Sequence, residues 1–198
     1  MPRPHLALLV GEVGSGKTTV CLRLAELASA RALRVGGIVT RALRDGEGRK
    51  TGLEALDLWT RESRLLARVD SAGNGSQGIW CPSPLCQGPH HFDPAVFAWA
   101  GAAVAVALAE GAGLVILDEV GPLELERGLG FAPWLGQIIS SPCSALLVVR
   151  RACLPALQAR LPGDAALFSV TAATRDGLPA AIVDMLCPQC KDRAPHLT

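Results

Sequence analysis

The sequence contains no tyrosine, and aromatic residues make up only 4% of its 198 residues. It also has no surplus of charge of either sign, because 19 basic and 18 acidic residues leave a formal net charge of +1. Such a balance argues against a large basic surface for nucleic acid or for an anionic membrane. We therefore expect neither nucleic acid nor a membrane among the partners of this protein.

Long apolar segments are missing as well. The uncharged, alanine-rich run Pro94 to Ala109 near the middle of the chain has 16 residues, fewer than the roughly 20 that span a bilayer. The apolar stretch Leu6–Val10 leads directly into a glycine-rich motif and is followed by no signal-peptide cleavage site. We therefore expect a cytoplasmic protein, whose thiols stay reduced.

The seven cysteines are an odd number, which argues against a complete disulfide framework. Two pairs, Cys81/Cys86 and Cys187/Cys190, have spacings at which thiolates could bind Zn²⁺. About a hundred residues separate the two pairs, however, and the first spacing is loose. We favour the interpretation that these cysteines hold no metal and are dispensable for catalysis.

Hydrophobic residues make up 49% of the chain and charged residues 19%, which excludes disorder along its whole length. Continuous apolar runs such as Leu6–Val10 and Leu114–Leu117 are typical of strands buried on both faces. Further strands are expected at Arg34–Thr40, Leu53–Trp59, Ser144–Val149 and Ala166–Val170, and helices at Lys17–Ala30, Pro94–Glu110, Ala132–Ser140, Pro155–Leu161 and Leu178–Leu186. This alternation predicts an α/β fold with a mainly parallel sheet flanked by helices.

The length fits one domain, which we expect over residues 1–186, followed by a short polar tail at 187–198. The charged turn Arg41–Lys50, between two expected strands, predicts a β-hairpin that projects from the sheet. Residues 70–91 are rich in glycine, serine and proline and have no hydrophobic period, so we expect a mobile loop there.

Residues 11–18 read GEVGSGKT and fit the phosphate-loop pattern G-x-x-x-x-G-K-[ST] at every fixed position. A buried strand precedes the motif and a helix follows it, which is the context that the motif requires. Backbone N–H groups of such a loop cradle phosphates, its lysine reaches the β- and γ-phosphates, and its threonine binds Mg²⁺. The expected nucleotide contacts are Gly11, Glu12, Val13, Gly14, Ser15, Gly16, Lys17, Thr18 and Thr19.

Two carboxylates, Asp118 and Glu119, follow the buried strand Leu114–Leu117, at the end where ligands bind in open α/β sheets. Asp118 would hold Mg²⁺ together with Thr18, and Glu119 would orient or deprotonate a water molecule at the γ-phosphate. Alternation along a strand would point the two side chains apart. We therefore expect the chain to turn at the strand end, before Gly121.

These motifs together resemble the small nucleoside-triphosphatases typified by cancer-related nucleoside-triphosphatase. The resemblance rests on GEVGSGKT, on VGGIVTRALRDGEGRKTGLEALDL at residues 35–58, on ILDEVGPLEL at residues 116–125, and on the segments SALLVVRRACLPAL and LFSVTAATRDGLP. In the second stretch Thr40, Arg44, Arg49, Gly52 and Leu53 stand at matching positions. The likeness extends over nearly the whole chain, to about Leu186.

The resemblance implies a RecA-like P-loop domain that slowly hydrolyses ATP, GTP and other nucleoside triphosphates with Mg²⁺. It implies that Leu114–Gly121 form a second nucleotide-contacting stretch, which adds Asp118, Glu119 and Gly121 to the site. The chain departs from the family pattern at two places. Pro122-Leu123 replace a Lys-Met pair, and Arg41-Ala42 replace an acidic pair.

Several cations are candidates for stabilising charge in the transition state. Arg150 and Arg151 end the expected strand Ser144–Val149, and Arg151 is our candidate catalytic arginine beside Lys17 and Glu119. Cations of the expected hairpin could fold over the nucleotide; they are Arg41, Arg44, Arg49 and Lys50.

Two other functions compete with hydrolysis. A P-loop kinase of nucleotides or small molecules would need an acceptor pocket and an arginine-rich lid, and no insertion of lid length is visible. A GTP-binding accessory protein of cofactor biosynthesis would hydrolyse GTP for a partner, but the guanine-reading motif N-K-x-D is absent. We expect a nucleoside-triphosphatase, and a monomer, although the sequence leaves the oligomeric state open.

Overall fold

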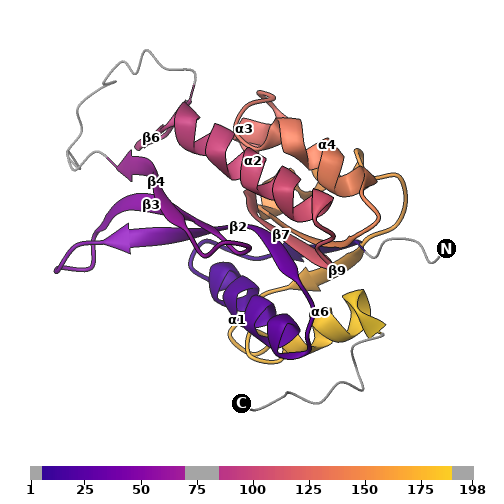
Figure 1. Cartoon of the computed structure of the whole chain (residues 1–198). Coiled ribbons are helices and arrows are strands. Elements are labelled where there is room, and N and C mark those ends of the chain that lie inside the picture. The colour runs from indigo at the N-terminus through magenta and orange to yellow at the C-terminus, as the bar shows by residue number, and fades with distance from the viewer. Residues whose placement is uncertain (1–5, 70–84, 189–198) are drawn as a thin grey trace.

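The computed structural model describes residues 6–69 and 85–188, which form a single nine-stranded sheet with helices on both faces (Figure 1). The order of the strands across the sheet is β5-β6-β4-β3-β2-β7-β8-β1-β9. Their bounds are β1 Leu6–Val10, β2 Val35–Arg44, β3 Lys50–Asp57, β4 Ser63–Val69, β5 Cys86–Gln87, β6 His90–Phe92, β7 Leu114–Val120, β8 Ser144–Val149 and β9 Ala166–Ser169.

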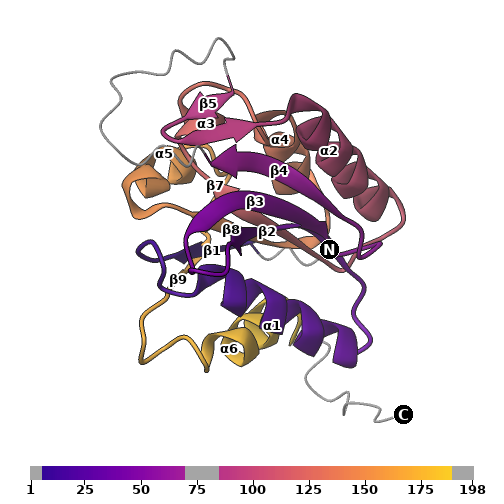
Figure 2. The same ribbon diagram turned by 90° about the vertical axis from the view of Figure 1, so that its left-hand side faces the viewer.

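The helices cover the two faces of the sheet (Figure 2). Helices α1 and α6 pack on one face, and α2, α3 and α4 pack on the other. Their bounds are α1 Lys17–Ala30, α2 Pro94–Ala109, α3 Pro122–Leu125, α4 Ala132–Ser140, the 3₁₀ turn η1 Arg151–Cys153, α5 Leu154–Gln158 and α6 Leu178–Leu186. Within the described part of the chain, no helix combines the length and the hydropathy of a membrane span.

Strand β1 shows why the expected apolar runs form the centre of the sheet. Leu8 and Val10 contact the core beneath α2 and α4, whereas Ala7 and Leu9 contact the core beneath α1 and α6. All four side chains are completely buried. A strand with helices on both faces needs apolar residues at every position, because neither of its faces is in contact with water.

The predicted parallel sheet is confirmed for one half of the molecule. Strands β2, β7, β8, β1 and β9 pair in parallel, and the helices Lys17–Ala30 and Leu178–Leu186 have the predicted bounds. The other half is antiparallel and larger than the single hairpin that the sequence predicted. Strand β4 was not predicted at all, and it pairs with β3 on one side and β6 on the other.

The segment expected to be a mobile loop, 70–91, is only partly described. Its last residues form β5, which pairs with β6 in a short antiparallel ribbon that extends the sheet beyond β4. The expectation of a loop was therefore wrong for Cys86–Gln87 and from His90 onward, where pairing with β4 supplies order that the local sequence does not predict. Residues 70–84 lie outside the described part of the chain, and so does most of the expected tail.

Gly37 permits the close pairing between β2 and β7. Its φ is +106°, a conformation that favours glycine, and a Cβ atom there would lie 2.0 Å from the carbonyl oxygen of Ile116 on β7. The same strand carries Thr40 three residues later, next to Asp118. The absence of a side chain at residue 37 thus lets β2 lie close enough to β7 to reach the acidic motif.

We predict that Gly37→Ala lowers the free energy of unfolding by about 3 kcal/mol, because the new methyl group must displace backbone atoms and also strains φ. Urea unfolding followed by circular dichroism measures the loss. The control is Gly136→Ala in α4, where a Cβ atom would meet nothing within 4 Å and where alanine favours the helix by about 1 kcal/mol. Equal urea midpoints for the Gly37→Ala variant and the parent would contradict the assigned role.

Candidate active site

The phosphate-loop motif connects the end of β1 to the start of α1. Gly14 and Gly16 have φ values of +79° and +96°, so the loop needs glycine at both positions. The buried ammonium group of Lys17 donates hydrogen bonds to the carbonyl oxygens of Gly11, at 2.9 Å, and Glu12, at 3.0 Å. The lysine therefore folds back over the loop, where it faces the space that the loop encloses.

The other loop residues that were expected to contact the nucleotide differ in their burial. Ser15 Oγ is buried and has no hydrogen-bond partner among the described residues. Val13 is 94% exposed at the tip of the loop, and Thr19 lies in the first turn of α1. A buried hydroxyl group that lacks a partner costs free energy, so Ser15 is suited to an acceptor such as a phosphate oxygen.

Asp118 joins the phosphate loop to the centre of the sheet. Thr18 Oγ1 donates a hydrogen bond of 2.9 Å to Asp118 Oδ2, and Thr40 Oγ1 donates one of 2.7 Å to the backbone carbonyl oxygen of Asp118. Burial, followed by the charge of neighbouring Glu119, raises the pKa of Asp118 to about 7. Two oxygen donors, Thr18 Oγ1 and Asp118 Oδ2, thus lie side by side at the end of the loop.

Glu119 lies between two cations. Its Oε1 is 3.9 Å from the ammonium nitrogen of Lys17, and its Oε2 is 3.3 Å from a guanidinium nitrogen of Arg150. The Glu119 side chain is 29% exposed, so a small ligand can reach it. The carboxylate of Glu119 therefore faces the phosphate loop, which follows β1, from β7, and β8 lies between these two strands.

The strand was expected to end at Leu117 and the chain to turn before Gly121; instead the strand includes both carboxylates, and both side chains still reach the phosphate loop. Strand β7 continues to Val120, and its register with β8 shifts between Leu117 and Val120. This irregularity breaks the alternation that would otherwise point the two carboxylates to opposite faces. The peptide bond between Asp118 and Glu119 is cis.

Arg150, rather than Arg151, is the arginine that contacts Glu119. Arg151 lies one residue further along, in η1, and its Nε is 3.1 Å from Oε1 of Glu12 on the phosphate loop. Both arginines are exposed at the rim of the site. A third arginine, Arg175, reaches the same loop, because a Cβ atom on Gly16 would lie 2.8 Å from its Cδ. Sequence reasoning assigned no role to Arg175, although it lies in the segment LFSVTAATRDGLP that carries the family resemblance.

Gly121 contacts a buried carboxylate on the far side of the acidic motif. Its N–H donates a hydrogen bond of 2.9 Å to Glu124 Oε2, and the N–H of Phe131 donates one of 3.2 Å to Glu124 Oε1. Glu124 is the second glutamate of the D-E-x-G-x-x-E-L pattern, to which the sequence alone assigned no role. These hydrogen bonds indicate that Glu124 caps the N-terminus of α3 and fixes the position of the segment after Glu119.

The hairpin arginines form ion pairs or hydrogen bonds within their own hairpin. Arg41 pairs with Glu54, Arg49 pairs with Asp45 and Glu47, and Arg44 donates a hydrogen bond to the carbonyl oxygen of Gly48. Lys50 is different, because its ammonium nitrogen lies 2.8 Å from Nε2 of His90 on β6. That contact was not predicted, since it depends on the pairing of β6 with β4.

The possible zinc site cannot be assembled from the described residues. Cys81 and Cys190 lie outside them, and Cys86 is in a disulfide bond, so the expectation that the thiols stay reduced is wrong for Cys86. Across residues 6–69 and 85–188, no group of three or more His, Cys, Asp or Glu side chains could hold a metal ion. The interpretation of these cysteines as dispensable stays a prediction.

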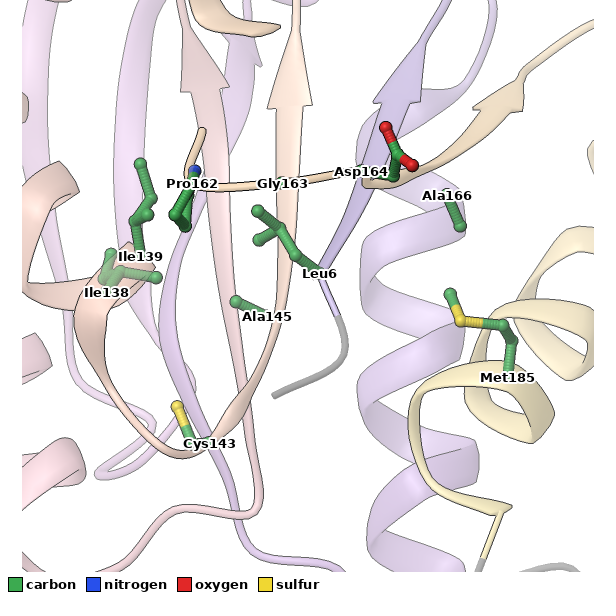
Figure 3. A pocket seen from close by; sticks show the side chains of 10 residues that line it. All are labelled: Leu6, Ile138, Ile139, Cys143, Ala145, Pro162, Gly163, Asp164, Ala166 and Met185. Carbon is green, nitrogen blue, oxygen red and sulfur yellow. The ribbon is translucent and has the colours of Figure 1, made fainter. Parts of the chain in front are cut away.

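A cavity of about 430 Å³ lies at the opposite edge of the sheet (Figure 3). It opens beside the first residues of three strands, Leu6 on β1, Ala145 near the start of β8 and Ala166 on β9, whereas the phosphate loop follows the last residue of β1. Asp164 is the one charged residue among its ten described lining residues. A ligand site usually combines apolar walls with several convergent polar groups, which this cavity lacks. The end of the sheet that carries the phosphate loop is therefore the better candidate for the ligand site.

Comparison with known proteins agrees with the geometry. The chain is 30% identical to nucleoside-triphosphatase THEP1 of Methanopyrus kandleri over 196 residues, which cover 96% of this chain and 99% of that protein. It is 33% identical to nucleoside-triphosphatase THEP1 of Thermofilum pendens over 175 residues, 87% of this chain and 90% of that protein.

The fold resembles the solution structure of a human cancer-related nucleoside triphosphatase. The TM-score is 0.70 at 23% sequence identity, over 93% of this chain and 98% of that one. This similarity supports the P-loop α/β fold that the sequence predicted. The family model described as NTPase matches residues 7–183, from β1 to α6. The resemblance inferred from the motifs is thereby confirmed, and the chain belongs to the NTPase family.

Proposed function

We propose that this protein is a cytoplasmic enzyme that hydrolyses nucleoside triphosphates, ATP and GTP among them, to the diphosphate and inorganic phosphate with Mg²⁺. The observation that carries the proposal is the position of Glu119. Its carboxylate lies within 3.9 Å of the phosphate-loop lysine and beside the metal-binding pair Thr18 and Asp118. The two relatives described above carry the name nucleoside-triphosphatase, which supports the same reaction.

The donor set fits Mg²⁺. This ion prefers oxygen ligands, keeps several waters, and binds nucleotides through one or two protein groups together with phosphate oxygens. Thr18 Oγ1 and Asp118 Oδ2 are such groups, and they lie 2.9 Å apart at the end of the phosphate loop. When bound, the ion would neutralise charge on the β- and γ-phosphates, and it would also stabilise the ionised form of Asp118.

The residues of the chain account for the other requirements of the reaction. Backbone N–H groups of the loop and Lys17 bind the phosphates, and Ser15 Oγ gains the partner it lacks. Glu119 accepts a proton from a water molecule, whose oxygen attacks the γ-phosphorus as the bond to the bridging oxygen breaks. Arg150 contacts Glu119 and Arg151 contacts the loop, so either can stabilise the charge that develops on the transferring group.

The space beside Glu119 favours water over a larger acceptor. A pocket of about 50 Å³ opens next to Glu119 and Arg150, lined further by Thr40, Leu53 and Phe92 among others. One water molecule needs on the order of 10–15 Å³ of such space. The pocket therefore has room for a few water molecules, which supports water as the nucleophile. The proposed partner is the nucleotide, and we propose no nucleic acid, membrane or second subunit for the reaction.

Lys17→Ala should abolish most triphosphate binding and lower turnover at least about a hundredfold, because a transition-state contact of a few kcal/mol is lost. The measurement is phosphate release from ATP, GTP, CTP and UTP, with nucleotide binding followed by calorimetry. Arg23→Ala is the matched control, since Arg23 is a cation on the same helix that pairs with exposed Asp176. Turnover by Lys17→Ala within a factor of about two of the parent would rule out the loop as the site.

Glu119→Gln separates binding from chemistry. The amide keeps the shape of the side chain but cannot accept the proton, so kcat should fall by about 10² to 10⁴ while affinity for the Mg²⁺–nucleotide complex changes little. Glu126→Gln is the control, because Glu126 is an exposed glutamate at the end of α3. Normal hydrolysis by Glu119→Gln would remove the chemical basis of the hydrolase assignment and move the kinase or accessory-protein alternatives ahead.

Asp118→Asn should make the ligand-free protein more stable than the parent at alkaline pH. The pKa of Asp118 is raised in the fold, so its favourable protonated state is lost as the pH rises toward and above about 7. The asparagine stays neutral throughout. Its advantage in unfolding free energy should grow by on the order of 2 kcal/mol between pH 5 and pH 8, measured by urea unfolding. A constant difference across this range would contradict the assigned pKa.

A further inference from the structure

Lys50 is an unusual cation in this chain. Sixteen of the 19 basic residues are arginines, and the three lysines are Lys17, Lys50 and Lys191. The first belongs to the phosphate loop, and the third lies outside the described residues. Lys50 is half-buried on β3, and it does not pair with the acidic side chains of its own turn. A compact ammonium group in a half-buried position needs a partner, and the structure supplies a histidine.

A β-bulge turns Lys50 toward the side of the sheet that carries the acidic motif. Leu43 on β2 pairs with Gly52 on β3, whereas the next residue, Arg44, pairs with Lys50, so that Thr51 is the extra residue. Side chains on opposite residues of paired strands share a face, and one residue of slip would move Lys50 to the other face. Because of the bulge, Lys50 shares the face of Arg44 and, by alternation, of Thr40, which binds Asp118.

His90 holds the ammonium group of Lys50 from the neighbouring ribbon. Its Nδ1 is 3.3 Å from the carbonyl oxygen of Gln87, and its Nε2 is 2.8 Å from Lys50 Nζ. The geometry fits a neutral imidazole that donates from Nδ1 and accepts a hydrogen bond from Lys50 at Nε2. Burial first, and then the positive charge of Lys50, lower the pKa of His90, which favours the neutral ring.

The Lys50–His90 pair lies behind the pocket beside Glu119, because Gln87 and Phe92, which both contact His90, line that pocket. The charges of Glu119 on β7 and Arg150 at the end of β8 act on both Lys50 and His90, and Arg44 on β2 acts on Lys50 as well. Gln87 and Arg150 line the small pocket beside Glu119 together with Phe92, whose ring stacks on that of His90. Lys17 and Arg150 thus flank Glu119, and Lys50 adds a third positive charge behind the pocket, so this excess of positive charge is suited to an anion.

We propose that Lys50, positioned by His90, binds the γ-phosphoryl group of the nucleotide from the pocket side of Glu119 and then holds the released inorganic phosphate. This inference rests on the proposed hydrolysis, because it assigns the terminal phosphate to the space between the phosphate loop and the pocket. Lys50 would contact the oxygens of the terminal phosphate, whereas His90 is a positioning residue that acts through Lys50. The β-phosphate remains with the loop, so a diphosphate does not use the Lys50 contact.

The test compares ligands that differ only in the terminal phosphate. Dissociation constants are measured by calorimetry for ADP and for the non-hydrolysable β,γ-imido analogue of ATP, both with Mg²⁺, and inhibition by inorganic phosphate is measured during turnover. Lys50→Met should weaken binding of the analogue and of phosphate at least about tenfold and leave ADP binding within a factor of about two. Lys50→Arg, which keeps a charge, should recover part of the loss.

Three further variants check the roles assigned to Lys50 and His90. Arg49→Met removes one positive charge from the same hairpin, at a residue that is exposed and pairs with Asp45 and Glu47, and should match the parent in every measurement. His90→Leu should show a smaller loss with the same selectivity for the terminal phosphate. His90→Gln should recover it, because the amide oxygen can accept the hydrogen bond from Lys50.

The ratio of the affinities for the ATP analogue and ADP decides the question. A ratio in Lys50→Met equal to that of the parent, whether both ligands weaken or neither does, would overturn the assignment of Lys50. If Lys50→Met unfolds at a lower temperature than the parent, His90→Leu provides the same ratio. A parent enzyme that releases no phosphate from any nucleoside triphosphate would instead overturn the proposed function, while the two binding constants still report on Lys50.

Discussion

The hydrogen bond from Thr18 to Asp118 connects two segments that lie 100 residues apart in the sequence. It joins the start of α1 to the end of β7, across the intervening strand β8. The parallel order of β7, β8 and β1 brings the ends of these strands to one edge of the sheet. Because each strand is buried on both faces, this edge is where polar side chains can meet water and a ligand.

The charges at this edge are arranged for a ligand that carries several negative charges. Asp118 is buried beside Glu119, and this proximity makes the ionised form of Asp118 costly in the ligand-free protein. Lys17 and Arg150 flank Glu119, and Lys50 lies nearby on β3. A nucleoside triphosphate with its cation would supply the charges that this arrangement lacks. The electrostatic free energy of the site is therefore least favourable when no ligand is bound, which is typical of preorganised catalytic sites.

The features that were predicted from the sequence are those whose signals are local. The phosphate loop has its own motif, and strands such as Leu114–Leu117 are apolar at every position because helices cover both faces. The bounds of the helix Lys17–Ala30 follow from a glycine before it and apolar residues at helical spacing. These local signals were enough to predict the parallel half of the sheet and to select Thr18 and the acidic pair as candidate site residues.

The features that were missed depend on pairing between distant segments. Strand β4 begins with three exposed residues, and its two buried residues, Leu66 and Ala67, are adjacent, so no alternation predicts a strand there. Strand β6 becomes a strand only beside β4. The bulge that turns Lys50 is likewise a property of two paired strands. The continuation of β7 through Asp118 and Glu119 could not be predicted either, because the glycine and proline that follow favour an earlier turn.

In the proposed reaction, water held by Glu119 attacks the γ-phosphorus of the nucleotide. Turnover of ATP in water enriched with ¹⁸O, followed by mass spectrometry of both products, shows which phosphorus atom receives the oxygen. We expect one ¹⁸O atom in each inorganic phosphate formed and none in the diphosphate. Label in the diphosphate, or phosphate that appears only after an acceptor is added, would contradict it.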